Sequence, residues 1–268
     1  MNVCASQAVT LSTPFADDLN AHADAGAVGV EIWLTKLETY LETAGLDDVK
    51  GIEQSRRLNL VAAAFQGGLL LSQGEARSAH FEHFKRRLGL CQELGIPTMI
   101  LTADFRQPPD ATSAERALVS AKQAAQWAAA FDVKLALEFR GSDAYCSCLD
   151  TTLNFIDAVA EPNLGVCLDW FHFYKGPSKP EDLDRLSPAN LFHVQVSDVP
   201  GVPRELMTDA DRVFPGEGDF RFGLLTECLE RIHYSGWVSV ELMNPVLWRM
   251  KPSQVVELAL TSVRKLFA

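Results

Sequence analysis

The chain alternates between short runs of apolar or β-branched residues and longer segments in which apolar residues recur every three or four positions. The short runs predict strands, and the longer segments, such as the one that carries Phe81, Phe84 and Leu88, predict amphipathic helices. The strands are expected at 3–9, 28–32, 58–65, 97–102, 133–138, 164–169, 191–196 and 237–241. The helices are expected at 15–25, 47–57, 78–95, 112–130, 148–160, 181–187, 220–232 and 252–267.

Some of the strand segments are apolar over nearly their whole length. The runs at 133–137 and 164–168 read Val-Lys-Leu-Ala-Leu and Leu-Gly-Val-Cys-Leu. Strands of this kind are expected in a parallel sheet that is covered on both faces. Eight strands that alternate with helices over 268 residues therefore predict an α/β protein, a (β/α)8 TIM barrel that forms a single domain over residues 1–268.

An open doubly wound sheet with a bound dinucleotide is the rival arrangement. It would place a Gly-rich turn directly after the first strand, where this chain has Ala8-Val9-Thr10-Leu11 instead. The first strand and its following segment therefore favour the barrel.

The net charge of the chain limits the classes of molecule that it is expected to bind. With 35 acidic and 24 basic side chains the formal net charge is −11, and such a surface repels phosphate backbones and anionic lipids. No apolar run reaches the roughly 20 residues that a membrane span needs. We expect a small molecule as the partner, and neither nucleic acid nor a membrane. A homo-oligomer is compatible with the sequence, although no helix stands out as an interface.

The cysteines and the first residues of the chain indicate the cellular compartment in which we expect the protein. The chain has six cysteines and starts without the basic and apolar regions of a secretory signal, so we expect reduced thiols in a cytoplasmic protein. Cys146 and Cys148 are separated by one residue, too few for the usual pair of zinc ligands.

Polar side chains stand at the carboxyl ends of four consecutive predicted strands. They are Glu138, Asp169, Gln195 and Glu241. In a barrel these ends converge on one mouth, where three acids repel one another unless a cation compensates their charge. Three carboxylates and one amide oxygen suit Mg²⁺ or Mn²⁺ best, with Co²⁺ and Zn²⁺ as alternatives. The sequence therefore predicts one divalent cation held by these four residues.

Several stretches around these positions resemble a known family, the xylose isomerase-like TIM barrels of the sugar phosphate isomerase/epimerase superfamily. This family includes ketose 3-epimerases and inosose isomerases and dehydratases, and the resemblance covers nearly the whole chain. The most specific stretches are 30–32, 136–139, 167–172, 193–198, 211–219 and 236–241.

The resemblance also implies roles for individual residues. Glu138, Asp169 and Glu241 match metal ligands of the family, and Glu138 and Glu241 match its acid/base pair. His172, in an Asp-x-x-His stretch, and Arg212, before Pro-Gly-x-Gly, match residues that hold the oxygens of the substrate.

Gln195 departs from the pattern of the ketose epimerases, which place a ligating histidine there. A glutamine in this place resembles the 3-dehydroshikimate dehydratase branch of the superfamily. The Pro-Gly-Glu-Gly-Asp stretch at 215–219 and the Glu-Leu-Met-Asn-Pro stretch at 241–245 resemble the sugar and inosose group instead. An isomerase or epimerase is therefore the leading prediction, and a dehydratase is the alternative.

The predicted chemistry follows from the two glutamates and the cation. A metal that bridges the carbonyl and the adjacent hydroxyl of a ketose, or of an inosose-like cyclic polyol ketone, stabilises the enediolate formed when a neighbouring C–H loses its proton. Glu138 and Glu241 can flank such a substrate as general acid and base. Return of the proton to the opposite face epimerises the carbon, return to the neighbouring carbon isomerises the sugar, and loss of a β-hydroxyl dehydrates it.

Two further residues are candidates for substrate binding. Trp33, at the end of the second predicted strand, is expected to form an apolar wall of the pocket. His193 lies two residues before Gln195 and so points to the same side of the strand, where it is either a substrate-binding residue or a core histidine one layer deeper.

The connection at 197–219 is unusually long and rich in proline and glycine. Loops of this length in a compact domain are usually functional, and we expect this one to be a mobile part of the active site. Arg212, within it, is expected either to clamp the substrate or to pair with Asp209 or Asp211.

Two other classes of function fit less well. A barrel of the endonuclease IV type needs clustered zinc-binding histidines and a basic DNA-binding face, whereas this chain has six scattered histidines and a net charge of −11. A catalytically silent binding barrel would not require acids at all three strand ends.

Overall fold

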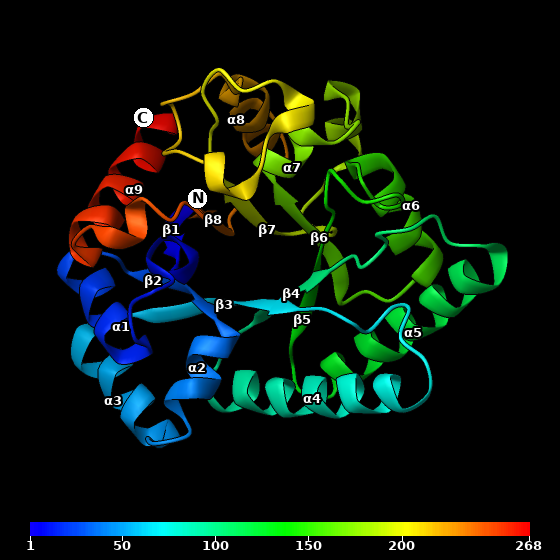
Figure 1. Cartoon of the computed structure of the whole chain (residues 1–268), viewed down its shortest axis with the longest axis horizontal. Coiled ribbons are helices and arrows are strands. Elements are labelled where there is room, and N and C mark those ends of the chain that lie inside the picture. The colour runs from blue at the N-terminus through cyan, green and yellow to red at the C-terminus, as the bar shows by residue number, and fades with distance from the viewer. The chain divides into compact units, whose positions relative to one another are not determined.

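The computed structural model describes residues 1–268, and its eight strands follow one another around a closed barrel in the order β1 to β8 (Figure 1). The pairs β1–β2, β4–β5, β5–β6, β7–β8 and β8–β1 are parallel. The predicted (β/α)8 barrel is confirmed. The strands are β1 (Asn2–Ser6), β2 (Gly29–Trp33), β3 (Asn59–Gln66), β4 (Thr98–Thr102), β5 (Lys134–Glu138), β6 (Leu164–Asp169), β7 (Leu191–Val196) and β8 (Trp237–Val240).

Nine α-helices and five short 3-10 helices connect or follow the strands. The α-helices are α1 (Phe15–Asp24), α2 (Leu34–Tyr40), α3 (Leu46–Arg56), α4 (Gly74–Glu93), α5 (Ala111–Ala129), α6 (Leu149–Val159), α7 (Trp170–Lys175), α8 (Phe222–Arg231) and α9 (Pro252–Leu266). The 3-10 helices are η1 (Gln7–Thr10), η2 (Pro180–Arg185), η3 (Arg204–Leu206), η4 (Asp209–Asp211) and η5 (Leu247–Arg249). None of the helices has both the length and the apolar character of a membrane span.

The structure corrects two predicted elements and adds two helices that were not predicted. The first strand stops at Ser6, whose side chain accepts a hydrogen bond from the backbone N–H of Ala8 and begins η1 over residues predicted as strand. The segment predicted as a helix at 181–187 is the 3-10 helix η2. Helices α2 and α7 were not predicted, because two turns or fewer are too short to show a helical period.

The chain folds into two compact units, one formed by residues 1–63 with 194–268 and one formed by residues 64–193. In the first unit β1 lies between β2 and β8, and α9 packs on β1 and on α1 (Figure 1). In the second unit β5 lies between β4 and β6, and α5 and α6 pack together beside these strands. The expectation of a single domain over 1–268 stays a prediction.

The core of each unit follows from the apolar stripes of its helices. On α9 the side chains of Val256, Leu260 and Val263 are fully buried, and on α6 Leu149 and Leu153 are buried in the same way. Burial of each such side chain contributes roughly 1.5–3 kcal/mol. These contacts fix the helices against the strands and so hold the polar residues at the carboxyl ends of the strands in place.

A buried ion pair joins α1 to α2 in the first unit. Asp18 is fully buried, accepts a hydrogen bond of 2.6 Å from Thr10 Oγ1 and pairs with Lys36 Nζ. His22 Nδ1 lies 3.2 Å from Asp18 Oδ1. Burial by itself would raise the pKa of Asp18, but the charges and hydrogen bonds of His22 and Lys36 outweigh it and lower that pKa.

We expect the Asp18→Asn substitution to lower the free energy of unfolding at pH 7 by about 3–5 kcal/mol, because it leaves Lys36 buried without its counter-charge. The pKa of Asp18 is lower in the folded than in the unfolded chain, so its ionised form stabilises the fold above about pH 4 and this contribution is lost as the pH falls through the folded pKa. Urea unfolding between pH 2 and pH 7 should show a smaller acid dependence for the variant.

Asp17 offers a matched control, since it is the neighbouring acid on α1 and is exposed. Asp17→Asn should change the free energy of unfolding by less than about 0.5 kcal/mol at any of these pH values. An equal effect of the two substitutions would mean that the Asp18 pair does not stabilise the fold.

Candidate functional site

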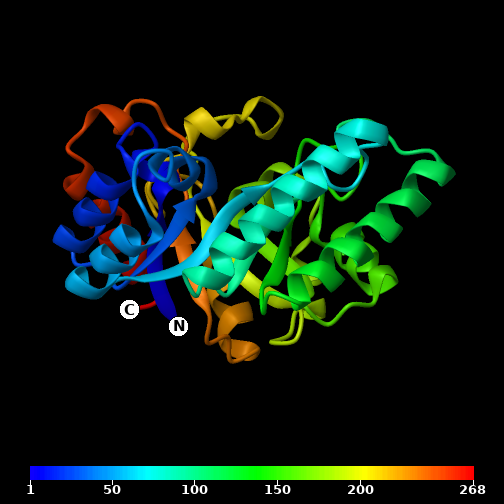
Figure 2. The ribbon, with the colours of Figure 1, turned by 90° about the horizontal axis from the view of Figure 1, so that it is seen from below.

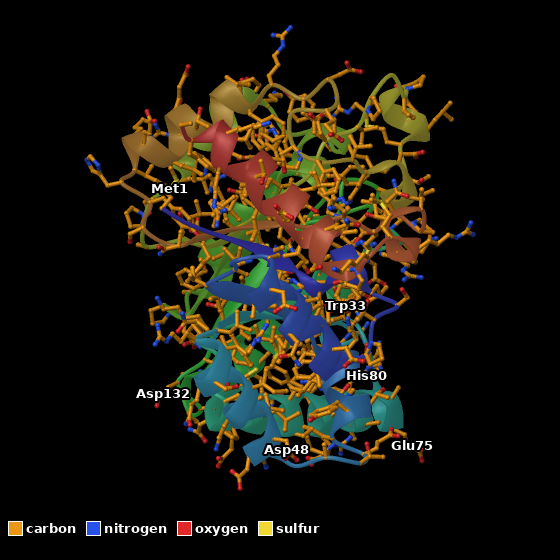
Figure 3. The ribbon with its side chains drawn as sticks, turned by 90° about the vertical axis from the view of Figure 1, so that its left-hand side faces the viewer. Met1, Trp33, Asp48, Glu75, His80 and Asp132 are labelled. Carbon is orange, nitrogen blue, oxygen red and sulfur yellow. The ribbon has the colours of Figure 1, made fainter.

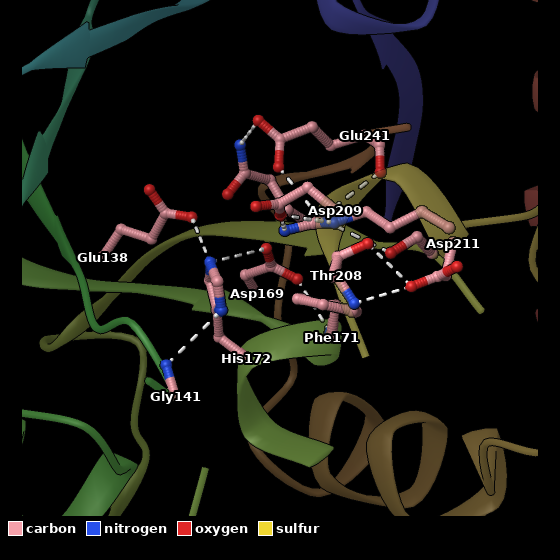
Figure 4. Close-up of polar contacts among 12 residues, drawn as sticks. Glu138, Gly141, Asp169, Phe171, His172, Thr208, Asp209, Asp211 and Glu241 are labelled. Carbon is pink, nitrogen blue, oxygen red and sulfur yellow. Dashed lines mark hydrogen bonds and ion pairs between the residues drawn. The ribbon is translucent and has the colours of Figure 1, made fainter. Parts of the chain in front are cut away.

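The unit of residues 64–193 holds one cluster of ionisable residues at the carboxyl ends of its strands. Glu138 ends β5, Asp169 ends β6 and His172 lies on α7, and all three are at least 93% buried (Figure 4). One ligand atom of each lies within 4.8 Å of the others. His172 Nε2 is 3.6 Å from Glu138 Oε1 and 3.8 Å from Asp169 Oδ2. Two buried carboxylates thus share one imidazole.

Asp169 positions this cluster by ending a strand and beginning a helix. Its Oδ1 accepts a hydrogen bond of 2.8 Å from the backbone N–H of Phe171, which starts α7 directly after β6. The first turn of the helix then places His172 three residues further on, beside the same carboxyl group. The short helix is therefore what brings the Asp-x-x-His stretch together.

The tautomer of His172 follows from the hydrogen bond that it accepts from the backbone of Gly141. The N–H of Gly141 donates to His172 Nδ1 at 3.4 Å, so the neutral ring carries its proton on Nε2, the atom that faces Glu138 and Asp169 (Figure 4). Only glycine fits at 141, because a Cβ there would lie 2.5 Å from the backbone nitrogen of Gly176. The close approach of these two glycines lets the N–H of Gly141 reach the ring.

The unit of residues 1–63 and 194–268 holds a second cluster, centred on an amide. Gln195 on β7 donates from Nε2 to Glu31 Oε1 at 2.9 Å and to Glu241 Oε1 at 3.1 Å. Glu31 lies on β2, and Glu241 follows the last residue of β8. Gln195 and Glu31 are fully buried, and Glu241 is 5% exposed. One glutamine side chain therefore orients two buried carboxylates.

Arg212 completes the second cluster from the segment 197–219. Its Nη1 lies 3.0 Å from Glu241 Oε2, and its Nη2 and Nε donate to Asp209 Oδ1 at 2.8 and 3.1 Å (Figure 4). The pairing expected with Asp209 is therefore present. Asp211 instead accepts from the backbone N–H and hydroxyl of Thr208. The side chain of Arg212 is 1% exposed, and its contact with a substrate stays a prediction.

The segment 197–219 is tied at both ends by one carboxylate. Asp198 is fully buried and accepts hydrogen bonds from the backbone N–H groups of Gly216, Gly218 and Phe220 at 2.9–3.1 Å. Asp198 also forms an antiparallel bridge with Val213. Figure 2 shows the part with η3 and η4, in yellow, at the end toward which β8 points. The mobility of this segment stays a prediction.

The two remaining predicted residues are buried. Trp33 ends β2, is 8% exposed and lines a cavity of about 520 Å³, and its backbone N–H donates to Gln7 Oε1 (Figure 3). Its role as an apolar wall of the substrate pocket stays a prediction. His193 on β7 is 1% exposed, and its role in binding stays a prediction.

Glu31 is the polar residue that the predicted ligand set omitted. It stands in the middle of a strand, Gly29–Trp33, whose residues are all buried. An acid inside an otherwise apolar strand is itself a signal, because a buried carboxylate needs a compensating donor. The predicted residues thus come together as Glu138 with Asp169 in one unit and Gln195 with Glu241 in the other.

A barrel with acids at its strand ends is shared by a large class of proteins, and sequence comparison places this chain within it. The chain belongs to the xylose isomerase-like TIM barrel family, which it matches over residues 19–266. The resemblance read from the sequence is confirmed.

Individual relatives carry more specific names. An inosose isomerase of Halalkalibacterium halodurans is 27% identical over 97% of this chain and 94% of its own length. A second inosose isomerase, from Bacillus velezensis, is 25% identical over the same shares. A 3-dehydroshikimate dehydratase of Pseudomonas aeruginosa is 25% identical over 88% of this chain and 37% of its own length.

Solved structures resemble the whole chain. A crystal structure of the IOLI protein with a bound zinc atom has a TM-score of 0.92 and 24% identity, and covers 99% of this chain and 98% of its own. A D-psicose 3-epimerase from Clostridium cellulolyticum has a TM-score of 0.80 and 17% identity over 100% of this chain and 98% of its own. These likenesses show the fold.

We expect Asp198→Asn to loosen the segment 197–219, because a neutral amide replaces charge-assisted hydrogen bonds to three backbone N–H groups. The free energy of unfolding should fall by about 1.5–3 kcal/mol, and limited proteolysis should cut within 200–211 at least several times faster. Glu217→Gln, an exposed change in the same segment, is the control and should alter neither measurement. Equal proteolysis of both variants would show that Asp198 does not hold the segment.

Proposed function

We propose that this chain is a divalent-metal-dependent isomerase or epimerase of a ketose or an inosose-like cyclic polyol ketone. The observation that carries the proposal is the buried cluster of Glu138, Asp169 and His172 at the ends of adjacent strands. A cluster that combines carboxylates with a proton-bearing imidazole is suited to moving protons next to a carbonyl. The full-length similarity to inosose isomerases supports the same class of substrate.

The proposed ligands of the cation are Glu138 and Asp169 together with Gln195 and Glu241. Their donor set is oxygen alone, which suits Mg²⁺ or Mn²⁺. The residues fit a cation because buried carboxylates need positive charge nearby, and His172 as a neutral ring supplies only a proton on Nε2. His172 is thus proposed as a donor to a substrate oxygen. The zinc atom belongs to the IOLI protein, and Zn²⁺ enters here as a competing ion to be tested.

The proposed acid and base are Glu138 and Glu241. A bound cation would polarise the carbonyl of the substrate and so acidify the neighbouring C–H. Glu241 is held at both oxygens, by Gln195 Nε2 at one and by Arg212 Nη1 at the other, so its orientation is set before substrate binds. Glu138 lies beside the Nε2 proton of His172. One glutamate takes the proton of the substrate, and the other returns it.

A dehydratase is the second candidate, and Gln195 favours it. The amide at this strand end resembles the 3-dehydroshikimate dehydratase branch, and one relative of that name is 25% identical over 88% of this chain. The same glutamates would then remove the proton and assist the departure of a β-hydroxyl. An unsaturated product absorbs in the ultraviolet, and an isomer does not, so one assay separates the two reactions.

We expect the purified chain to hold about one divalent ion, counted by elemental analysis. Asp169→Asn should lower the occupancy at least tenfold, because a neutral amide replaces a charged ligand, whereas Asp132→Asn, an exposed change, should leave it unaltered. Gln195→His should keep an ion but shift the preference toward Zn²⁺ or Co²⁺. Unchanged occupancy in Asp169→Asn would remove this residue from the ligand set.

We expect Glu138→Gln and Glu241→Gln to lose turnover at least a hundredfold at saturating metal, because the amide retains an oxygen ligand but cannot accept the proton. In an isomerase or epimerase, solvent deuterium should enter the substrate in one variant without conversion to product. A dehydratase would instead form the ultraviolet-absorbing product without returning a proton to the ring. Recovery of normal activity in both variants with excess metal would limit these glutamates to metal binding.

A further inference from the structure

A cavity of about 520 Å³ lies beside the carboxyl ends of β1 and β2, within the unit of residues 1–63 and 194–268. Its walls come from the connection between β1 and α1, from the end of β2 and from α2. Barrel enzymes bind their substrates at this end of the strands. Among the residues predicted to bind the metal or the substrate or to transfer a proton, only Trp33 lines this cavity.

The floor of the cavity is aromatic. Phe15 and Trp33 are 2% and 8% exposed, and Tyr40 packs against Phe15 with ring centroids 5.5 Å apart and planes inclined by 31°. Flat aromatic walls fit the apolar C–H face of a saturated ring and leave the polar substituents of that ring at its edge. The floor therefore suits a ring rather than an extended chain.

The rim of the cavity carries hydroxyl groups. Thr35 and Thr39 on α2, and Thr43 just beyond it, are spaced by four residues and are exposed. Residues at this spacing lie along one face of a helix, as Thr35 and Thr39 do on α2. A threonine hydroxyl both donates and accepts hydrogen bonds, so the row matches the hydroxyls at the edge of a sugar or polyol ring.

Lys36 offers the cavity a hydrogen-bond donor, and Asp18 compensates its positive charge. Its Nζ donates to the backbone oxygen of Thr10 at 3.1 Å and pairs with Asp18. An ammonium group has three N–H donors, which leaves one for a ligand in the cavity that Lys36 lines. Because Asp18 compensates the charge, the site favours a neutral hydroxyl over a phosphate or carboxylate.

One strand, β2, carries both a residue of the second cluster and a residue of the cavity wall. Glu31 and Trp33 are two residues apart on β2, and a strand advances about 3.3 Å per residue, so their Cα atoms are roughly 7 Å apart. Glu31 accepts a hydrogen bond from Gln195, which also donates to Glu241. Side chains two residues apart on a strand point to the same side, so Trp33 of the cavity and Glu31 of the second cluster lie on one side of β2.

We propose that this cavity is a subsite for a second, neutral, hydroxylated ring, so that the chain prefers a ketose or cyclic polyol ketone that carries a glycosyl substituent. The reacting ring is the one of the proposed function, on which this inference rests. Binding of the second ring requires no turnover, so it can be tested separately from the reaction.

The test compares isomaltulose, a glucosyl fructose, with fructose itself. By calorimetry the metal-loaded wild-type chain should bind isomaltulose at least tenfold more tightly than fructose. Thr39→Trp places a large side chain at the rim and should abolish this preference, as should Tyr40→Leu, which removes one aromatic ring of the floor. Thr261→Trp, an exposed change on α9 away from the cavity, should keep the preference.

The outcomes separate the subsite from the proposed function. A preference for isomaltulose that Thr39→Trp abolishes supports the subsite even if neither ketose nor an inosose is converted, in which case the proposed function alone fails. Equal binding of the two ketoses by the wild type, or an unchanged preference in both cavity variants, overturns the subsite even if an inosose is converted.

Discussion

Buried negative charge at the carboxyl ends of the strands is the constraint on which the rest of this structure depends. Glu31, Glu138, Asp169 and Glu241 are all at least 93% buried, and each needs a donor or a positive charge to offset its lost hydration. Each unit meets this need in its own way. One places the proton of His172 between two acids, and the other uses Gln195 and Arg212.

The two clusters differ in how completely the negative charge of their carboxylates is offset. In the unit of residues 64–193 the acids face a neutral ring that donates one proton, so their negative charge is only partly offset and suits a cation. In the other unit an arginine and an amide fix both oxygens of Glu241. Under the proposed function both arrangements would contribute ligands to the cation, and the second would in addition keep Glu241 in one orientation while it exchanges a proton.

Apart from Gln195 on β7, the groups that offset the charge come from loops and short helices. His172 comes from α7, the Gly141 N–H from the segment after β5, and Arg212 from the segment tied by Asp198. The strands thus provide the carboxylates and one amide donor at fixed positions, and the connections supply the other donors and charges around them. This division explains how barrels with the same strand-end acids can differ in reaction and substrate.

The sequence by itself determined the barrel and most of its acids, because hydrophobic periodicity is local and the strand-end residues Glu138 and Asp169 follow directly from it. It did not predict α2 and α7, which are too short to show a period. The tertiary structure alone decided which groups meet: Gln195 reaches Glu31 across 164 residues, and Arg212 reaches Glu241 across 29. Periodicity carries no information about such contacts, since they depend on how strands and loops that are distant in sequence close in space.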